Sequence, residues 1–435
     1  MATLPPSRRG RKNLQPSLLD YDRKLDANRY DLETNPQGIV DLGRSQVDFM
    51  REELASWLDR NLTPSELSGE FKYNVSEGSP ALLQAAAGFM NRVFKSHIPL
   101  EPDNMIATNG VSSLLNALSF NLCDEGDTML FLTPGFGGLI FDAVMRNGVN
   151  VVNVPCDDVP DIRFQAHEAP GSESGELAVE IVHRLETALE TETAGGNTVT
   201  TVLLANPENP LGRSYAPEVL LRVSRFCESR GLHLIVDEIF AMTGGKSFTS
   251  ILSLDLGSNR ENVHALWGMS KDFGFGGLRI GFLATYNRLL RETMLTLSYF
   301  NWITSFSDTV ASRLLADADY LESEYLPLFH QRLDERREHI GRQLDQRGIP
   351  YIKPNAGLHM LINLSAWLDG DVTGEGELKL QEEIWKAGVF MMAGQAFCCR
   401  EPGWFRLCFC VNEDEFSVGL DRLLSRLGTP NGKGH

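Results

Sequence analysis

The sequence lacks the long apolar runs and the basic charge that several classes of protein require. No stretch of about 18 apolar residues occurs, so no membrane-spanning helix is expected. The N-terminal basic residues are not followed by an apolar segment, which argues against a secretory signal. Forty basic residues stand against 58 acidic ones, which gives a net charge of −18. A chain this acidic is a poor candidate for binding nucleic acid.

Cysteine is also scarce, with seven residues, no Cys-x-x-Cys pair and no histidines at zinc spacing. We therefore expect no metal site and reduced thiols in a cytoplasmic protein. Internal repeats and low-complexity tracts are missing too. The chain has 42% hydrophobic and 23% charged residues, which is ordinary for a globular protein. Its 435 residues are too many for one simple core and predict two domains.

From about residue 104, short apolar runs alternate with segments that have helical spacing. The runs at 128–132, 199–205 and 232–236 are rich in Val, Ile and Leu. This pattern is typical of an α/β fold with a mostly parallel sheet covered by helices on both faces. Functional side chains in such a sheet gather at the carboxyl ends of the strands.

After about residue 282 the predicted strands become sparse. A long polar helix over about 318–347 leads into short strands and helices, which predict a smaller α+β domain. We expect four regions, here in chain order: a flexible tail over 1–30, an N-terminal part of the small domain over 31–70, a large cofactor-binding domain over 71–315 and a C-terminal small domain over 316–435.

The stretch Ala265–Gly281 has the clearest chemical pattern. Its apolar run ends at Ser270-Lys271, and a glycine-rich loop with Arg279 follows. A lysine at the end of a buried strand, with backbone amides and an arginine nearby, suits a Schiff base with pyridoxal 5′-phosphate (PLP). A surface lysine in a glycine-rich turn explains this stretch alone about equally well, so the remaining residues must decide.

Other strand ends carry side chains that would complete a PLP site. Asp237 ends an apolar run, where a buried carboxylate needs a cationic partner such as a protonated pyridine nitrogen. Asn209, in a Pro-Leu-Gly turn, could donate to the ring oxygen. Gly110, Val111 and Ser112 open a helix whose free amides and dipole suit a phosphate. Taken singly, each also fits an ordinary helix cap or turn.

Two further residues are candidates for contacts with ring and substrate. Phe136 could stack on the pyridine ring, although a lone Phe usually belongs to a core. Arg406 is a charge inside an apolar strand, and such an arginine should be paired. It could bind a substrate α-carboxylate through two hydrogen bonds or form a structural ion pair. Gly274-x-Gly276 lacks the spacing of a dinucleotide motif, so NAD is not expected.

Taken together and in order, the motifs resemble those of fold-type I PLP-dependent aminotransferases. The resemblance covers about 30–430 and implies a large domain with a mostly parallel seven-stranded sheet plus a smaller α+β domain. The last motif resembles the 1-aminocyclopropane-1-carboxylate (ACC) synthase-like branch. The motifs are Asn-Pro-x-Asn-Pro-Leu-Gly (206–212), Asp-Glu-Ile (237–239), Ser-Lys-Asp-x-Gly…Gly-Leu-Arg-Ile-Gly (270–281), Asn-Ala-Gly-Leu (355–358) and Glu-Pro-Gly-Trp-Phe-Arg-Leu-Cys-Phe (401–409).

The resemblance implies a role for each matching residue around the cofactor. Lys271 would form the Schiff base and move the Cα proton, Asp237 would pair with the pyridine nitrogen, and Asn209 with the ring oxygen. Arg279 and Ser270 would contact the phosphate together with the amides of the helix start.

The resemblance also implies partners. Arg406 would bind the carboxylate of an amino-acid-type substrate. Tyr73 matches a tyrosine that the family usually sends into the neighbouring subunit's site, which implies a homodimer with shared active sites.

Several positions depart from the family pattern. Phe240 and Phe136 stand where tyrosines are usual, and Gly268 stands where a phosphate-binding serine is usual. True ACC synthases have Ala-Glu-Asn-Gln where this chain has residues 45–48, so Gln46 takes the place of a substrate-contacting glutamate. These departures argue against plant-type ACC synthesis and predict a more apolar cofactor pocket.

Reactions in this class begin with removal of the Cα proton from an amino acid or a cysteine-type conjugate. Fungal members of the branch include C–S lyases, often called aminotransferases, that release thiols in epidithiodiketopiperazine pathways such as that of gliotoxin. We therefore expect β-elimination by a C–S lyase or transamination, in fungal secondary metabolism. ACC synthesis is the second alternative, and a non-catalytic binding or regulatory protein is a remote third.

Overall fold

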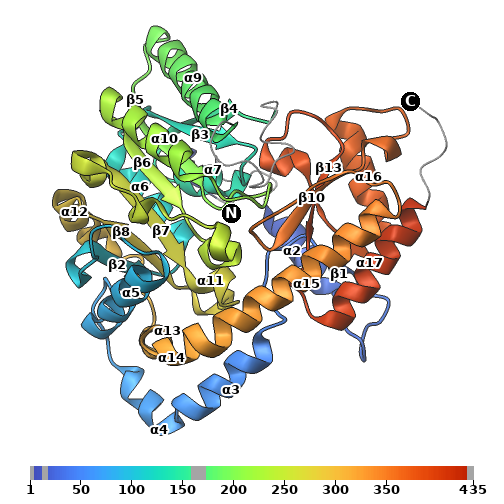
Figure 1. Ribbon diagram of the computed structural model, residues 1–435, viewed down its shortest axis with the longest axis horizontal. Helices are drawn as coiled ribbons and strands as arrows, with labels where there is room; N and C mark the ends of the chain where they lie inside the picture. The colour runs from blue at the N-terminus through green and yellow to red at the C-terminus, as the bar shows by residue number, and fades with distance from the viewer. Residues whose placement is uncertain (1–3, 12–17, 158–172, 429–435) are drawn as a thin grey trace.

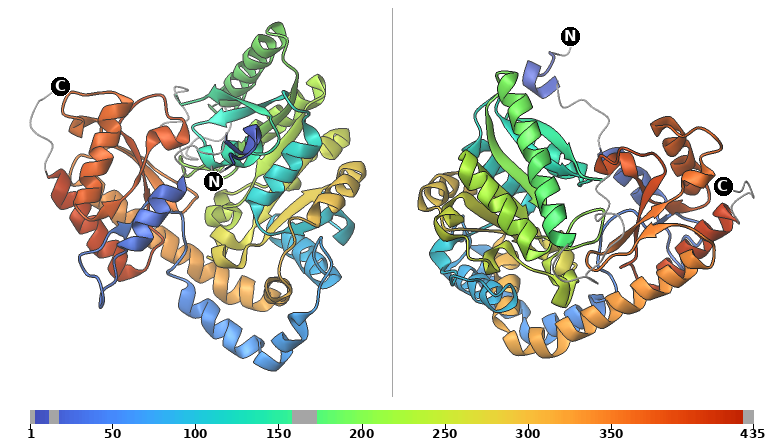
Figure 2. Two further views of the ribbon diagram at one scale, coloured as in Figure 1. Left: turned by 180° about the vertical axis from the view of Figure 1, so that it is seen from behind. Right: turned by 45° about the horizontal axis from the view of Figure 1, so that its top comes forward.

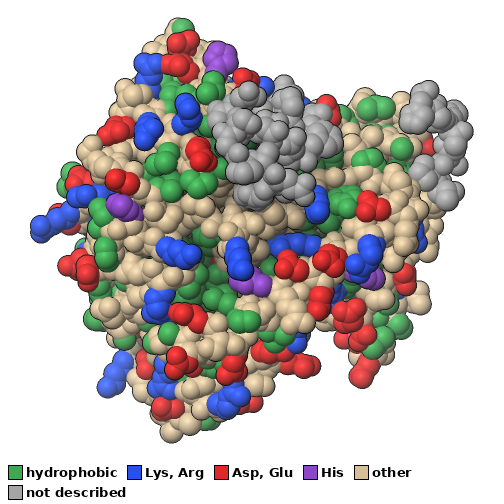
Figure 3. Space-filling view, viewed as in Figure 1, with side chains coloured by type: hydrophobic (Ala, Val, Ile, Leu, Met, Phe, Trp, Pro, Cys, Tyr) green, Lys and Arg blue, Asp and Glu red, His purple; other side chains and the backbone are tan. Residues whose placement is uncertain are grey.

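The computed structural model of the protein describes residues 4–11, 18–157 and 173–428 (Figure 1). Residues 1–3 and 12–17 of the predicted tail lie outside these ranges, as do residues 158–172 and 429–435. Figures 1 and 2 show two domains side by side, with the long helix α15 (Leu326–Asp345) running from one to the other. Acidic and basic side chains are interspersed over the face seen in Figure 3.

A seven-stranded sheet is the centre of the large domain, in the order β2-β8-β7-β6-β5-β3-β4. The pairs from β7 to β4 are parallel, and β8 is antiparallel to both of its neighbours. The predicted mostly parallel sheet is thus confirmed. The strands are β2 (Met105–Thr108), β3 (Thr128–Thr133), β4 (Asn150–Pro155), β5 (Val199–Ala205), β6 (His233–Asp237), β7 (Val263–Gly268) and β8 (Gly281–Thr285).

Helices cover both faces of this sheet, which explains why its central strands are apolar on both sides. Ile235 of β6 packs into a cluster with Leu114 and Met294, whereas the next residue, Val236, faces the main core that continues into the small domain. The helices of this domain are α5 (Pro80–Val93), α6 (Val111–Leu122), α7 (Gly137–Val144), α9 (Glu173–Ala194), α10 (Pro217–Arg230), α11 (Met269–Asp272), α12 (Arg288–Ser298) and α13 (Ser305–Ala316).

The small domain is built from both ends of the chain. A four-stranded antiparallel sheet has the order β12-β13-β10-β9, and β1 near the N-terminus pairs in parallel with β11. The strands are β1 (Val40–Asp41), β9 (Tyr351–Ile352), β10 (His359–Asn363), β11 (Val389–Phe390), β12 (Met392–Ala393) and β13 (Trp404–Cys408). The remaining helices are α1 (Arg8–Arg11), α2 (Leu18–Ala27), α3 (Arg51–Asn61), α4 (Pro64–Leu67), α14 (Ala318–Tyr320), α16 (Gly374–Lys386) and α17 (Glu413–Leu427).

Helix α2 lies within the segment 1–30 that we predicted to be a flexible tail. Leu25 is fully buried in a cluster with Ile39 and Phe390, and the ring of Tyr21 stacks on Phe390 with centroids 5.7 Å apart. The prediction of a flexible tail therefore does not hold for α2. The sequence alone did not indicate this helix. Charged residues surround its few apolar positions, which makes its apolar stripe narrow.

Among the described residues, no helix combines the length and the apolar character needed to cross a bilayer.

Candidate active site

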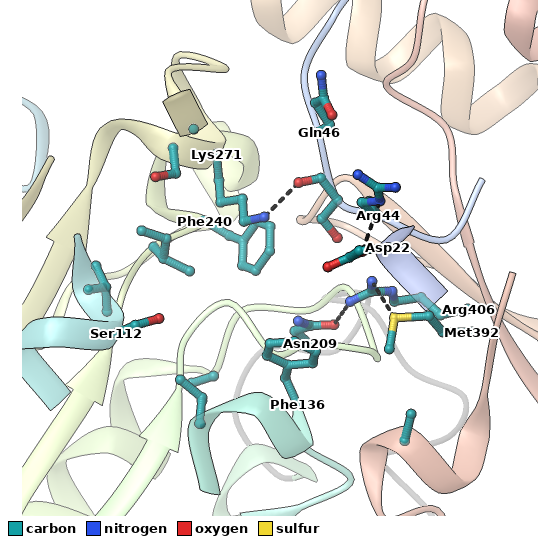
Figure 4. Close-up of a pocket in the computed structure, with 18 of the residues that line it drawn as sticks. Asp22, Arg44, Gln46, Ser112, Phe136, Asn209, Phe240, Lys271, Met392 and Arg406 are labelled. Carbon is teal, nitrogen blue, oxygen red and sulfur yellow. Dashed lines mark hydrogen bonds and ion pairs between the residues drawn. The ribbon is translucent and has the colours of Figure 1, made fainter. Parts of the chain in front are cut away.

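A cavity of about 770 Å³ lies between the two domains, at the carboxyl ends of the central strands (Figure 4). This is the place where an α/β sheet usually binds its ligand. The structure brings most of the sequence-predicted residues to this cavity. Those that line it are Gln46, Val111, Ser112, Phe136, Asn209, Asp237, Phe240, Ser270, Lys271, Arg279 and Arg406.

Lys271 extends into the cavity from the short helix α11, which follows β7 directly. Its Nζ donates a hydrogen bond to the carbonyl oxygen of Ser45 at 2.6 Å. Burial, with the nearby charge of Arg406, lowers the pKa of this amine to about 8. A substantial neutral fraction near neutral pH suits an amine that attacks an aldehyde and later accepts a proton.

Asp237 is the last residue of β6 and is buried, and its Oδ1 accepts a hydrogen bond from the backbone N–H of Ile239 at 3.1 Å. Burial raises the pKa of this carboxyl to about 7, and the charge of Lys271 offsets only part of that shift. A protonated ring nitrogen is the type of cation that would restore the carboxylate form.

Arg406 of β13 is held at the cavity by one contact with the large domain and one with the small domain. Its Nη1 donates to Oδ1 of Asn209 at 2.8 Å, and its Nη2 donates to the carbonyl oxygen of Gly43 at 2.6 Å. The guanidinium lies 4.6 Å from the ring centre of Phe397. Because Oδ1 of Asn209 accepts from the arginine, Nδ2 is the atom that can donate to a ring oxygen. Among the described residues, Nε of Arg406 is buried without a hydrogen-bond partner, so the arginine retains donor capacity for a carboxylate.

An anion cradle forms where the start of α6 meets the loop before β8. Gly110 is the N-cap of α6 with φ +113°, and a Cβ there would lie 2.4 Å from Nη2 of Arg279. Arg279 itself adopts a left-handed backbone with φ +53°. Ser112 and Ser270 line the same part of the cavity. Backbone amides at a helix start, two hydroxyls and a guanidinium together fit a phosphate.

Gly268 explains why a serine is missing from this cradle. A Cβ at this position would lie 2.7 Å from the carbonyl oxygen of Ile280 and 3.2 Å from Cγ2 of Val111. The backbone just before β8 therefore excludes a side chain, and no hydroxyl can be supplied from here without displacing it.

Phenylalanines form the apolar walls predicted from the sequence. Phe240 is buried and meets the ring of His359 edge-on, with centroids 5.4 Å apart. Phe136 precedes α7 and lies 6.1 Å from the ring of Phe397. Gln46 also lines the cavity, but its Nε2 donates to Oδ1 of Asp48 at 2.9 Å, which restricts its amide.

Tyr73 and Gly110 are the predicted residues that do not line this cavity. Gly110 lies directly behind it against Arg279, whereas Tyr73 is 94% exposed and contacts the ring of Trp302 at 5.7 Å. A role for Tyr73 would therefore have to be in a neighbouring subunit's site, as the resemblance implied.

Several cavity residues were missed by the sequence analysis. Tyr21, Asp22 and Arg44 also line the cavity. Nε of Arg44 lies 3.3 Å from Oδ1 of Asp22 (Figure 4). Nothing in the local pattern marked them. Asp142 also lines the cavity. Its signal was available, since it is a charge within the apolar sequence of α7.

The fold is the one that fold-type I PLP-dependent enzymes adopt. A model of the family described as aminotransferase class I and II matches residues 37–423, and the chain belongs to this family. The chain's own residues fit that cofactor, because one cavity combines a buried amine, a buried carboxyl and an anion cradle.

The chain is similar to curated relatives with different activities in their names. It is 29% identical to the mouse "Probable inactive 1-aminocyclopropane-1-carboxylate synthase-like protein 2" over 405 residues, 91% of this chain and 67% of that protein. It is 29% identical to 1-aminocyclopropane-1-carboxylate synthase 7 of Arabidopsis thaliana, over 92% of this chain and 90% of that one. Aspartate aminotransferase from Thermus thermophilus with maleate has a TM-score of 0.75 at 20% identity, covering 98% and 100% of the two chains. This last likeness concerns the fold.

Proposed function

We propose that this protein removes the Cα proton of an amino acid or a cysteine-type conjugate and then completes either β-elimination of a sulfur substituent or transamination. The observation that carries this proposal is the position of Lys271. Its buried amine, with a lowered pKa, shares one cavity with Asp237 and with the anion cradle.

Each residue around the cofactor would have a separate role. Lys271 would hold it covalently and, once displaced by the substrate amine, act as the base at Cα. Asp237 would keep the pyridine nitrogen protonated, and Asn209 would donate to the ring oxygen. Bound PLP supplies an electron sink for the negative charge left at Cα. Arg279, Ser270 and the start of α6 would hold the phosphate.

Arg406 would fix the substrate by its α-carboxylate. Its contacts with Asn209 and the carbonyl of Gly43 orient the guanidinium before a substrate arrives. Arg406 would thus bind the substrate carboxylate while it also contacts Asn209, whose amide would face the cofactor. This coupling favours one orientation of the Cα–H bond relative to Lys271.

The walls of the cavity favour elimination or transamination over ACC synthesis. Phe240 and Phe136 replace two hydroxyl-bearing rings, and Gln46 is bonded to Asp48. Phe397 and Met392 add apolar surface beside Arg406, which suits a bulky thioether substituent. Of these reactions, we favour that of a C–S lyase in fungal secondary metabolism. ACC synthesis is the alternative, supported by the names of the relatives.

Absorbance of the purified protein tests whether it is a PLP enzyme. The wild type reconstituted with PLP should show a visible band that Lys271→Ala lacks, while the exposed Lys246→Ala should keep it. A wild type with no band after reconstitution would reject the enzyme proposal in favour of the non-catalytic alternative.

Three parallel assays separate the reactions. The enzyme is incubated with S-substituted cysteines, with S-adenosylmethionine, and with an amino acid plus a 2-oxo acid. Pyruvate, ammonia and a free thiol from the first establish the lyase. Turnover confined to the third rejects the lyase and establishes a transaminase, and release of ACC from the second establishes the alternative.

A further inference from the structure

Asp142 is an unexpected acidic residue in the anion cradle. It is the one charged residue in α7, and it lines the cavity beside Ser112 and Arg279. A hydrogen bond with Ser112 and the charge of Arg279 lower the pKa of this carboxyl, but burial raises it by more. Ser112 and Arg279, which we expect to contact a phosphate, thus also interact with a carboxyl of the chain itself.

The charged groups around Asp142 come from several elements. Arg279 lies in the loop before β8, Ser112 is on α6, and Asp237 at the end of β6 is close enough for the Asp142 charge to raise its pKa further. Arg279 is thus the cation that acts on Asp142, and Asp237 is a second carboxyl within electrostatic reach of Asp142. A phosphate bound here would place a second anion beside the Asp142 carboxylate in this partly buried space, which is unfavourable unless a proton is taken up.

The cradle also lacks one hydroxyl donor of the family pattern, because Gly268 stands where a phosphate-binding serine is usual. Gly268 cannot carry a hydroxyl, because its Cβ would lie 2.7 Å from the carbonyl oxygen of Ile280. A protonated carboxyl group is a hydrogen-bond donor, whereas a carboxylate only accepts. Protonated Asp142 could therefore supply the missing donor and relieve the repulsion at the same time.

We propose that Asp142 is a proton-carrying member of the phosphate cradle. In the cofactor-free protein its carboxylate holds Ser112 and Arg279 in place. When the cofactor phosphate binds, the carboxylate takes up one proton from solvent and donates a hydrogen bond to a phosphate oxygen. The step exchanges hydrogen bonds and one proton, and no covalent bond within the chain is broken. This inference rests on the PLP-binding function proposed above.

The test is the pH dependence of cofactor binding, measured by titrating cofactor-free protein with PLP between pH 6 and 9 and following absorbance or quenching of protein fluorescence. One proton taken up per phosphate makes the dissociation constant rise by up to tenfold per pH unit. Asp142→Asn cannot take up a proton but can donate a hydrogen bond. It should therefore bind PLP about tenfold more tightly than wild type at pH 8 and show a shallower slope. Asp124→Asn, an exposed carboxyl, is the control and should behave as wild type.

Pyridoxal, which lacks the phosphate, separates this role from an effect on the ring. Asp142→Asn should leave pyridoxal affinity unchanged. An equal change for both ligands, or no change for PLP, would overturn the proposal. If the asparagine variant does not fold, Asp142→Ser with its hydroxyl donor is measured in its place and must give the same result. A wild type that binds neither ligand would instead reject the PLP function itself.

Discussion

At the scale of single residues, the cavity contains two ionisable groups whose pKa values burial shifts toward neutral pH. Burial raises the pKa of Asp237 to about 7 and lowers that of Lys271 to about 8. Both groups are therefore costly to the cofactor-free protein and become useful only when a bound ligand brings the complementary charge. Stability and function should accordingly respond in opposite directions when such a group is removed.

Asp237→Asn should stabilise the cofactor-free protein while impairing catalysis. The folded pKa of the carboxyl, about 7, is above its ordinary value of 3.8, so its ionisation costs nothing below pH 4 and its full penalty is present above pH 7. The gain in the free energy of unfolding should grow over that interval to roughly 1–3 kcal/mol. Urea denaturation at pH 4, 5.5 and 8 measures it. A variant less stable than wild type at pH 8 would show that Asp237 is already paired.

Gly268→Ser should not repair the phosphate cradle. The added Cβ would meet the carbonyl oxygen of Ile280 at 2.7 Å, and we expect a loss of about 1–3 kcal/mol in the free energy of unfolding. Gly69→Ser is the control, because nothing lies within 4 Å of its Cβ position. Thermal unfolding compares the two variants. Tighter PLP binding by Gly268→Ser at unchanged stability would contradict the steric argument.

At the scale of elements, the pair Ser79-Pro80 at the start of α5 is a helix-start pattern that can be read from the sequence. Oγ of Ser79 accepts from the N–H of Leu82 at 3.1 Å, and Pro80 is the first helical residue. The structure adds a contact that the sequence could not give. The N–H and Oγ of Ser79 donate to Asp308 of α13 at 2.7 and 2.6 Å, so the cap also joins two helices.

Ser79→Ala should therefore destabilise the protein more than the loss of an ordinary helix cap does. Losing the cap and one donor to the buried Asp308 together should lower the free energy of unfolding by about 1–3 kcal/mol. Ser65→Ala in the exposed α4 should change it by less than about 0.5 kcal/mol. Equal effects of the two substitutions in urea denaturation would mean that the link to Asp308 contributes nothing.

The elements also show where sequence reasoning stops. Residues such as Asp237 and Lys271 could be predicted because each follows an apolar run, and the ends of parallel strands meet at one edge of a sheet. Ser45 and Gly43 contact the site through backbone carbonyls, which carry no residue-type signal. Helix α2 reaches the cavity only because of how the two ends of the chain pack, and no local pattern reports that.

At the scale of the whole molecule, an exposed aromatic cluster indicates an interface. Phe71, Tyr73, Tyr299 and Phe300 are each more than 65% exposed, and Tyr73 and Tyr299 both contact Trp302. Exposed aromatic patches of this kind usually mark a contact surface. The cluster adjoins the phosphate cradle, since the N–H of Asn109 donates to the carbonyl of Asn301 at 2.8 Å.

We therefore expect a homodimer that uses this cluster. Sedimentation should give the mass of two 48.4 kDa chains. Phe300→Asp should shift it toward the monomer and weaken PLP binding, because a charge in an apolar interface is costly. Val372→Asp, at an exposed apolar position in the small domain, should leave both unchanged. A wild-type monomer that binds PLP fully would contradict shared sites.

The antiparallel strand β8 has a consequence for how the protein is made. It aligns Gly281 between Thr108 and Gly268, so the end of β2 and the end of β7 are brought together only once β8 is present. On the ribosome, the cradle cannot close before about residue 285 has emerged. Arg406 and the strand β11, which pairs with β1, follow more than a hundred residues later. The strands that form the anion cradle are thus all synthesised well before the strand that carries Arg406.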